Sequence, residues 1–244
     1  MIVQACLNGA RPASFHPRLP TTADALAADA RAVVAAGAAE IHAHVRGDDG
    51  RETLAAAAVD RTVTLLRTAV PGTLLGISTG AWIEGDADRT LASIASWSQL
   101  PDYASVNLSE TAAPAVIELL HRRGVGIEAG LASARDAERL LALGIGPLCL
   151  RILIEIEEQN VTAAHAAADA VLTALAKAPW SKAMLLHGFD ATVWPLAEKA
   201  LRLGLSTRVG LEDGAILPDG STAPDNAALV AAAAELAAKV RPLP

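Results

Sequence analysis

Two histidines separated by one residue, His42 and His44, lie in a short apolar segment and are the first candidates for chemistry in this sequence. The alternation from Ile41 to Arg46 is typical of a β-strand, in which residues two apart point to the same face. His42, His44 and Arg46 would then share one face. Two neutral imidazoles on a rigid strand are half of a metal site. The same pattern also fits two histidines that only hydrogen-bond in a core, so the choice depends on a further ligand.

A candidate third ligand lies near the end of the chain, in residues 208–213, whose sequence is RVGLED. Strand alternation puts Arg208, Gly210 and Glu212 on one face. Two histidines and one carboxylate, with water or substrate in the last position, are a common catalytic zinc arrangement. Glu212 could instead pair with Arg208 and only tie the fold together. Asp213 is either a base that Arg208 orients or a partner in a structural salt bridge.

The elements that would position these residues are eight short β-rich segments alternating with eight longer segments of helical periodicity. The predicted strands cover residues 2–7, 40–45, 74–78, 104–107, 124–128, 149–154, 183–186 and 207–211. The predicted helices begin near Thr22, Leu54, Asp86, Ala112, Ser133, Val161, Thr192 and Asp225. This alternation predicts an α/β fold, a (β/α)₈ TIM barrel that forms one domain over residues 1–244. A doubly wound open sheet is the alternative, but residues 8–11 (NGAR) lack the glycine-rich phosphate-binding turn that such a sheet usually carries.

In such barrels the active site lies at the carboxyl ends of the strands. Every predicted strand here ends in polar or titratable residues: Asn8; His42, His44 and Arg46; Ser78 and Thr79; Ser105 and Asn107; Glu128; Glu155; His187; and Glu212 and Asp213. Barrel closure would bring the strand of Glu212 within about 10 Å of the strand of the histidines, since only the first strand lies between them. Trp82, beside Ser78 and Thr79, is expected to pack rather than to recognise a substrate.

The composition excludes several classes of partner. A net charge of −7 and a pI near 5.3 oppose binding to nucleic acid or to an anionic membrane. No apolar run reaches the ~18 residues of a membrane span, and the amino terminus has no signal-peptide pattern. Cys6 and Cys149 fall in predicted strands and are expected to be buried, reduced thiols. We therefore expect a cytoplasmic protein.

Taken together, these segments resemble the β-keto acid cleavage enzymes, a family whose founding member is the 3-keto-5-aminohexanoate cleavage enzyme. The resemblance runs from the first predicted strand to the last. It rests on residues 7–10 (LNGA) with 16–17 (HP) and 19–21 (LPT), on 41–50 (IHAHVRGDDG), on 78–80 (STG) and on 208–213 (RVGLED). The HxHxR and RxGxED segments are specific for the family only in combination.

The resemblance implies a barrel with a divalent metal, usually zinc, that converts a β-keto acid and acetyl-CoA into acetoacetate and a new CoA thioester. By this likeness His42, His44 and Glu212 are the metal ligands. Asp213, oriented by Arg208, is then the base. Zinc would polarise the keto oxygen as a Lewis acid, and the carboxylate would move the proton that starts the carbon–carbon bond exchange.

Further site residues follow from the same likeness and from the strand ends. Ser78 and Ser105 correspond to hydroxyl side chains around the substrate, and Glu128 to a functional acid on the fifth strand. The remaining candidates for substrate contacts are Thr79, Asn107, Asn8, Arg11, Arg46 and His187. Among these, Arg46 is expected to anchor an anionic substrate and His187 to donate a hydrogen bond.

Two departures from the founding enzyme bear on the substrate. Arg11 stands where that enzyme has an acidic residue facing its substrate's ammonium group, so we expect a substrate that ends in a carboxylate or a neutral polar group. The segments near residues 109–113 and 155–162, which follow the fourth and sixth strands, look shorter than in that enzyme. Because these loops form the mouth of the site, acetyl-CoA is a weaker expectation than zinc.

Two other functions compete with this reading. A metal-dependent hydrolase of the amidohydrolase type also uses HxH in a barrel, but that class carries the motif on the first strand and further histidines on strands five and six. Here those strands end in Glu128 and Glu155. A barrel that binds a small acid or a metal without turnover is the third possibility, against which the cluster in residues 208–213 argues. The expected partners are small molecules and further copies of this chain, since the related enzymes assemble as oligomers.

Overall fold

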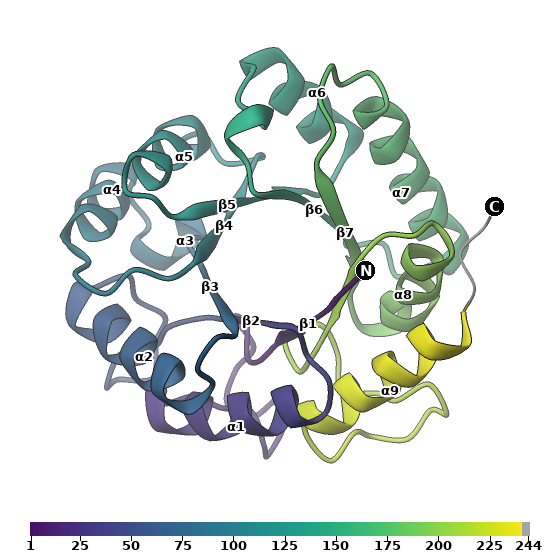
Figure 1. The fold of residues 1–244 in the computed structure, drawn as a ribbon, viewed down its shortest axis with the longest axis horizontal. Helices are drawn as coiled ribbons and strands as arrows, with labels where there is room; N and C mark the ends of the chain where they lie inside the picture. Colours follow the sequence, from purple (N-terminus) through teal and green to yellow (C-terminus); the bar gives the residue numbers. More distant parts are fainter. Residues whose placement is uncertain (241–244) are drawn as a thin grey trace.

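The computed structural model describes residues 1–240 and shows a ring of parallel strands surrounded by helices (Figure 1). The strands are β1 (Val3–Cys6), β2 (Glu40–Ala43), β3 (Leu74–Ser78), β4 (Tyr103–Asn107), β5 (Gly126–Leu131), β6 (Arg151–Ile156), β7 (Ala183–Gly188) and β8 (Thr207–Val209). They pair in the order β7-β6-β5-β4-β3-β2-β1-β8. A bridge between Leu185 and Ser206 joins β7 to the start of β8 and closes the ring. The predicted (β/α)₈ barrel is confirmed.

The helices cover the outside of the ring (Figure 1). They are α1 (Ala23–Ala35), α2 (Ala56–Ala69), α3 (Ala81–Glu84), α4 (Ala87–Ser96), α5 (Ala113–Arg122), α6 (Ala134–Leu143), α7 (Val161–Leu175), α8 (Val193–Arg202) and α9 (Asn226–Lys239). Side chains cap several starts: the Thr22 hydroxyl accepts from the N–H of Ala25, and the Asp225 carboxylate from that of Ala228. The eight predicted helices all begin within two residues of the expected position. The single-turn α3 was not predicted, because four residues carry no helical periodicity.

The apolar core lies between the strands and the helices, while the inside of the barrel is polar. Five side chains from β1, β2, β4, β5 and β6 meet inside the ring: Gln4, Glu40, Tyr103, Glu128 and Arg151. Arg151 contacts Glu40 on the opposite side of the barrel, and its Nε lies 2.7 Å from Glu128 Oε1. We call these five residues the inner network.

Glu128 therefore corrects one prediction. The fifth strand was expected to end at Glu128, but it continues to Leu131, so Glu128 is its third residue and lies inside the barrel. Gln4 donates to Glu128 Oε1 at 3.0 Å, and the side chain is completely buried. The apolar residues 129 and 131 continue the alternation beyond Glu128. A buried acid inside a strand was thus mistaken for a strand end.

Two strands that carry site residues end earlier than predicted. β2 stops at Ala43 rather than at residue 45, and β8 stops at Val209 rather than at residue 211. At Gly210 the chain passes so close to β1 that an added Cβ would lie 1.9 Å from the Cys6 carbonyl oxygen, so only glycine fits. His44 and Glu212 consequently stand just beyond their strands, in the loops at the carboxyl end of the barrel.

Two expectations from composition can be compared with the structure. Cys6 and Cys149 are both buried and unpaired with each other, as predicted. Within residues 1–240, none of the helices is both long and apolar enough to cross a bilayer.

Candidate functional site

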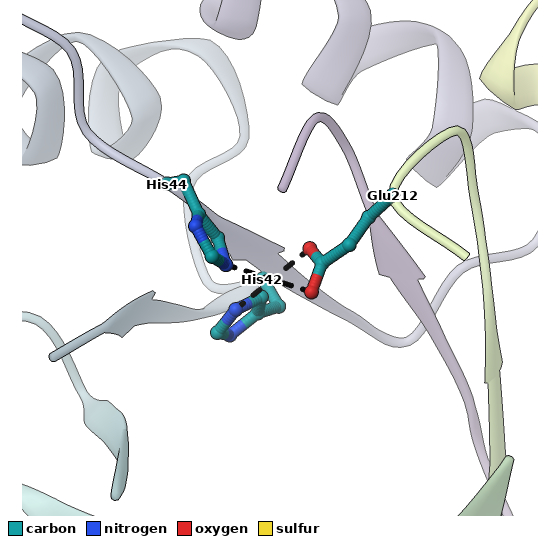
Figure 2. Close-up of side chains that lie close together, drawn as sticks. All are labelled: His42, His44 and Glu212. Carbon is teal, nitrogen blue, oxygen red and sulfur yellow. Dashed lines mark ion pairs between the residues drawn. The ribbon is translucent and has the colours of Figure 1, made fainter. Parts of the chain in front are cut away.

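His42, His44 and Glu212 converge at the carboxyl end of the barrel (Figure 2). His42 Nε2 lies 3.9 Å from Glu212 Oε2, and His44 Nε2 lies 3.5 Å from Glu212 Oε1. One nitrogen or oxygen from each residue lies within 4.8 Å of the other two. Ligand atoms around a tetrahedral zinc with bonds of about 2.0–2.1 Å are about 3.3 Å apart, so the present spacing is close to that of a metal site.

The backbone holds both histidines in register with the first strand. Asn8, directly after β1, accepts from the His44 N–H and donates to the His44 carbonyl, both at 2.9 Å. Gly9 adopts φ +55°, and a Cβ there would lie 2.4 Å from Glu212 Cγ. The glycine thus permits both a left-handed turn and the close approach of the Glu212 side chain.

Asn226, the first residue of α9, fixes the loop that carries Glu212. Its amide donates to the Leu7 carbonyl at 2.8 Å, and its oxygen accepts from the Leu211 N–H at 2.7 Å. Asn226 also donates to Asp29 of α1 at 2.6 Å. A single buried side chain therefore ties β1, α1 and the loop after β8 together.

The charge states of His42 and Glu212 suit a cation, whereas His44 holds a proton that a metal would displace. Burial lowers the pKa of His42 to about 3, so its imidazole is neutral. Burial acts in the same direction on His44, but the carboxylates of Glu212 and Glu52 outweigh it and raise the pKa of His44 to about 9. Burial favours the neutral form of Glu212, yet Arg208 and the histidines hold its pKa well below the usual range. A divalent cation would replace the proton on His44, as metals do at such ligands.

Unpartnered atoms support the same assignment. Glu212 Oε2 and His42 Nδ1 are buried, and neither has a hydrogen-bond partner among the described residues. An ionised carboxylate oxygen left in this condition carries a large desolvation cost. A bound cation would remove that cost at Glu212, so the donor set of two imidazoles and one carboxylate fits a divalent metal ion.

A second group of ionisable residues adjoins the triad. Arg208 donates to Glu212 Oε1 at 2.6 Å and to Asp213 Oδ1 at 2.9 Å. Arg208 and Asp213 are both buried, and His187 Nδ1 lies 3.4 Å from Asp213 Oδ1. Asp213 Oδ2 has no hydrogen-bond partner within residues 1–240. The arginine thus orients a completely buried carboxylate whose second oxygen has no partner in the described part of the chain.

A cavity of about 460 Å³ opens beside these residues. Eight of the residues predicted for the site line it: Arg11, His42, His44, Ser78, Ser105, Asn107, Arg208 and Glu212. The wall also includes Trp82, Glu155, Phe189 and Asp190. Trp82 was expected to pack, and it stacks on His44 with ring centroids 6.3 Å apart, but it is also 52% exposed and lines the cavity.

The other predicted residues do not line the cavity, and the completely buried Asp213 is one of them. Thr79 donates to the Ser105 carbonyl at 2.7 Å, and Asn8 holds the backbone of His44. His187 lies behind Asp213. Glu128 belongs to the inner network, below the cavity.

Arg46 and Arg11 are engaged with backbone carbonyls. Arg46 was expected to anchor an anionic substrate, but its guanidinium donates to the carbonyls of Gly9 and Arg11 at 2.9 and 2.7 Å and does not line the cavity. Arg11 does line it; its Nε donates to the Glu212 carbonyl at 3.0 Å, and its NH2 group pairs with Asp190 at 2.7 Å. Arg46 thus braces the loop after β1, and Arg11 joins that loop to the one after β8.

Glu52 is a site residue that the sequence analysis missed. Its Oε1 lies 2.5 Å from His44 Nδ1, on the side of the ring away from Glu212. The residues Asp48, Asp49 and Gly50 are typical of a tight turn, which would return the chain toward His44. That turn was the available signal for Glu52.

The sequence also matches known proteins. A family described as beta-keto acid cleavage enzyme matches residues 1–242. The chain is 33% identical to the 3-keto-5-aminohexanoate cleavage enzyme of Acetoanaerobium sticklandii over 81 residues, which are 33% of this chain and 30% of that enzyme. The local alignment thus spans under a third of that relative's length.

Solved structures resemble the barrel at low identity. The apo structure of ObcA and the ternary complex of ObcA with C4-CoA adduct and oxalate give TM-scores of 0.68 and 0.69 at 19% identity. Each alignment covers 90% of this chain but only 61% and 63% of ObcA. A type I 3-dehydroquinate dehydratase from Clostridium difficile gives 0.67 at 13% identity, covering 98% of this chain and 93% of that one. These likenesses establish the fold.

Proposed function

The chain belongs to the β-keto acid cleavage enzyme family, and we propose that it is a zinc-dependent enzyme that exchanges acyl groups between a β-keto acid and acetyl-CoA. The products would be acetoacetate and a new CoA thioester. The observation that carries the proposal is the buried group of His42, His44 and Glu212, which adjoins the Arg208–Asp213 pair and opens into the cavity.

We assign separate roles to the metal-binding residues and to the Arg208–Asp213 pair. Zinc held by His42, His44 and Glu212 would act as a Lewis acid toward the keto oxygen. Asp213 would accept the proton whose removal starts the carbon–carbon bond exchange, and Arg208 would hold that carboxylate in position through its hydrogen bond.

The cavity wall suits a small acid. The Ser78 and Ser105 hydroxyls and the Asn107 amide line it and would bond the polar ends of the substrate. Its volume of about 460 Å³ lies at the lower end of the range for ligand sites, about 300–1,000 Å³. Such a volume would accommodate a small keto acid with the reactive end of acetyl-CoA.

Arg11 would exclude substrates that carry an ammonium group. Its guanidinium lies in the cavity wall, where it would repel a cation, while Asp190 and two backbone carbonyls hold it in place. We therefore propose a substrate that ends in a carboxylate or a neutral polar group. Replacing Arg11 by glutamate should shift preference toward amino-substituted keto acids, and an unchanged preference would exclude this role.

The test of the function is a panel of β-keto acids assayed with acetyl-CoA and the zinc-loaded protein, with acetoacetate as the readout. The proposal predicts acetoacetate and an equal amount of new thioester with at least one keto acid. Hydrolysis of amides or lactones without thioester exchange would instead indicate chemistry of the amidohydrolase type. Zinc binding without turnover on any of these compounds would also contradict the proposal.

A further inference from the structure

His44 is held from two sides, and only one of them belongs to the metal triad. Its Nε2 faces Glu212 at 3.5 Å, whereas its Nδ1 lies 2.5 Å from Glu52 Oε1. The side chains of His44 and Glu52 are only 6% and 13% exposed. His42 has no such support, because its Nδ1 lacks a hydrogen-bond partner among the described residues. The two histidines are therefore positioned by different means.

A short hairpin fixes the backbone of Glu52. Arg46 and Glu52 form an antiparallel bridge, and the Thr53 N–H donates to the Val45 carbonyl at 3.0 Å. The N–H of Gly47 donates to the Arg51 carbonyl at 2.9 Å across the same turn. This pairing places the backbone of Glu52 beside the segment that carries His44, so the short Glu52 side chain can contact the imidazole.

Trp82 holds the other end of the Glu52 carboxylate. Its indole Nε1 donates to Glu52 Oε2 at 3.1 Å. Its ring stacks on His44, with centroids 6.3 Å apart and an interplanar angle of 25°. Both carboxylate oxygens are thus occupied, one by the imidazole and one by the indole. The half-exposed tryptophan therefore both stacks on His44 and fixes the orientation of the Glu52 carboxylate.

A carboxylate on Nδ1 determines what Nε2 can do. With Nδ1–H donating to Glu52, the lone pair of a singly protonated ring lies on Nε2, which faces Glu212. Such a partner fixes the tautomer and the ring orientation, and it makes the ligand more basic. We propose that Glu52, itself held by Trp82, is a positioning residue that presents His44 Nε2 to the metal; this inference rests on the metal site of the proposed function.

Zinc affinity is the first test, measured by competition with a chromophoric chelator on the full-length protein. Glu52→Leu should bind zinc about 10–100-fold more weakly than the wild type, because losses of this size follow removal of such partners. Glu52→Gln retains an oxygen that accepts from Nδ1–H, so it should recover most of that loss. Trp82→Phe keeps the stacked ring but loses the donor, and should fall between the wild type and Glu52→Leu.

The matched control is Asp48→Leu, which removes an exposed carboxylate from the same hairpin and should leave zinc affinity unchanged. Circular dichroism and thermal melting establish that each variant is folded. Zinc binding by Glu52→Leu at the wild-type affinity would overturn the proposal, as would an equal loss in Asp48→Leu.

A spectroscopic readout on the wild type removes the dependence on variants. The imidazole ¹H–¹⁵N spectrum of the zinc-loaded protein should show His44 bound through Nε2, with an Nδ1–H proton that exchanges slowly with water. Binding through Nδ1, or a rapidly exchanging Nδ1–H, contradicts the proposal even if Glu52→Leu does not fold. Zinc binding without keto acid turnover would refute the proposed function but not the role of Glu52, so the two failures are distinguishable.

Discussion

The barrel contains two buried charged clusters, and they differ in how their opposite charges meet. In the inner network, Arg151 directly contacts the carboxylates of Glu40 and Glu128, and its guanidinium lies 4.7 Å from the centre of the Tyr103 ring. The one cation of this network therefore contacts both of its carboxylates. None of its five residues lines the cavity.

The cluster at the carboxyl end has gaps where the inner network has contacts. Arg208 contacts Glu212 directly, but His42 and His44 stand 3.9 and 3.5 Å from the Glu212 oxygens. An unpartnered oxygen does not separate the two clusters, because Glu128 Oε2 and Glu212 Oε2 both lack a hydrogen-bond partner within residues 1–240. Burial alone does not separate the two clusters, since both contain groups with shifted pKa values. The separation of the charged atoms and the access to a cavity do distinguish a ligand site from a structural ion pair.

The largest expected effect comes from Asp213, which Arg208 holds beside Glu212. Asp213→Asn retains a carbonyl oxygen that can accept from Arg208, but it removes the base. The kcat for acetoacetate formation should fall about 10²–10⁴-fold. Steady-state kinetics measure this, with thermal melting to show that the fold is kept. A kcat within threefold of the wild type would remove Asp213 from the chemistry.

The next effect tests the inner network. Arg151→Met leaves Glu40 and Glu128 as uncompensated buried acids, and breaking such a pair costs about 3–5 kcal/mol of unfolding free energy. Urea denaturation measures the loss, while the zinc affinity of the folded protein should not change. The triple variant with Glu40→Gln and Glu128→Gln should recover much of the stability. A loss of zinc affinity equal to that of Glu212 variants would contradict the division into two clusters.

A smaller effect is expected at Gly9, whose lack of a side chain leaves room for the Glu212 side chain. Gly9→Ala adds a Cβ 2.4 Å from Glu212 Cγ at a φ of +55°, so it both strains the backbone and displaces the ligand. The strain costs about 1–3 kcal/mol, and zinc affinity should fall as well. Gly72→Ala is the matched control: its φ is +83° but no heavy atom lies within 4 Å of the added Cβ. Equal zinc affinities in the two variants would show that zinc binding does not depend on the space that Gly9 leaves for Glu212.

The smallest effect concerns Asp29, a half-buried carboxylate that accepts a hydrogen bond from the neutral amide of Asn226. Burial raises the pKa of Asp29 to about 6, although the hydrogen bond from Asn226 opposes this shift. The folded state therefore binds the proton more tightly than the unfolded chain, and stability decreases as the pH rises from about 4 to 6. Asp29→Asn removes this cost and should raise the Tm by about 2–4 °C at pH 8.

Below pH 4 the Asp29→Asn gain should vanish, because Asp29 is then protonated in both states. Asp24→Asn, which changes an exposed carboxylate on the same helix, provides the control. Equal gains for Asp29→Asn at pH 4 and pH 8 would show that the charge is not the cause.

Much of the fold and the convergence of His42, His44 and Glu212 could be predicted from the sequence, because both depend on local patterns. Helical periodicity located the helix starts within two residues, and strand alternation put His42 and His44 on one side. Glu212 was identified by an argument from a strand that ends at Val209, three residues before it. The prediction succeeded because barrel closure, rather than strand parity, brings the loop after β8 next to β2.

The remaining site residues depend on contacts that no local pattern contains. Glu52 reaches His44 only because the hairpin pairs it with Arg46, and Arg46 turns away from the cavity to bond two carbonyls. The alternation of side chains around Glu128 would be the same whether it stood at the end of a strand or inside one. Only the pairing of β5 with β6 shows that it lies beside Arg151. Sequence patterns thus located the residues that alternate along strands. They did not locate residues such as Glu52 and Arg46, whose positions depend on contacts between loops.

The most direct test of the central claim is the metal content of the purified protein after exposure to zinc and removal of unbound ions, compared with that of Glu212→Gln. Glutamine keeps the size of the side chain but loses the charge that the histidines and Arg208 surround. We expect one zinc per wild-type chain and a large loss of zinc from Glu212→Gln, with both proteins folded. A wild-type protein that retains no zinc, or a Glu212→Gln variant that retains as much as the wild type, would contradict it.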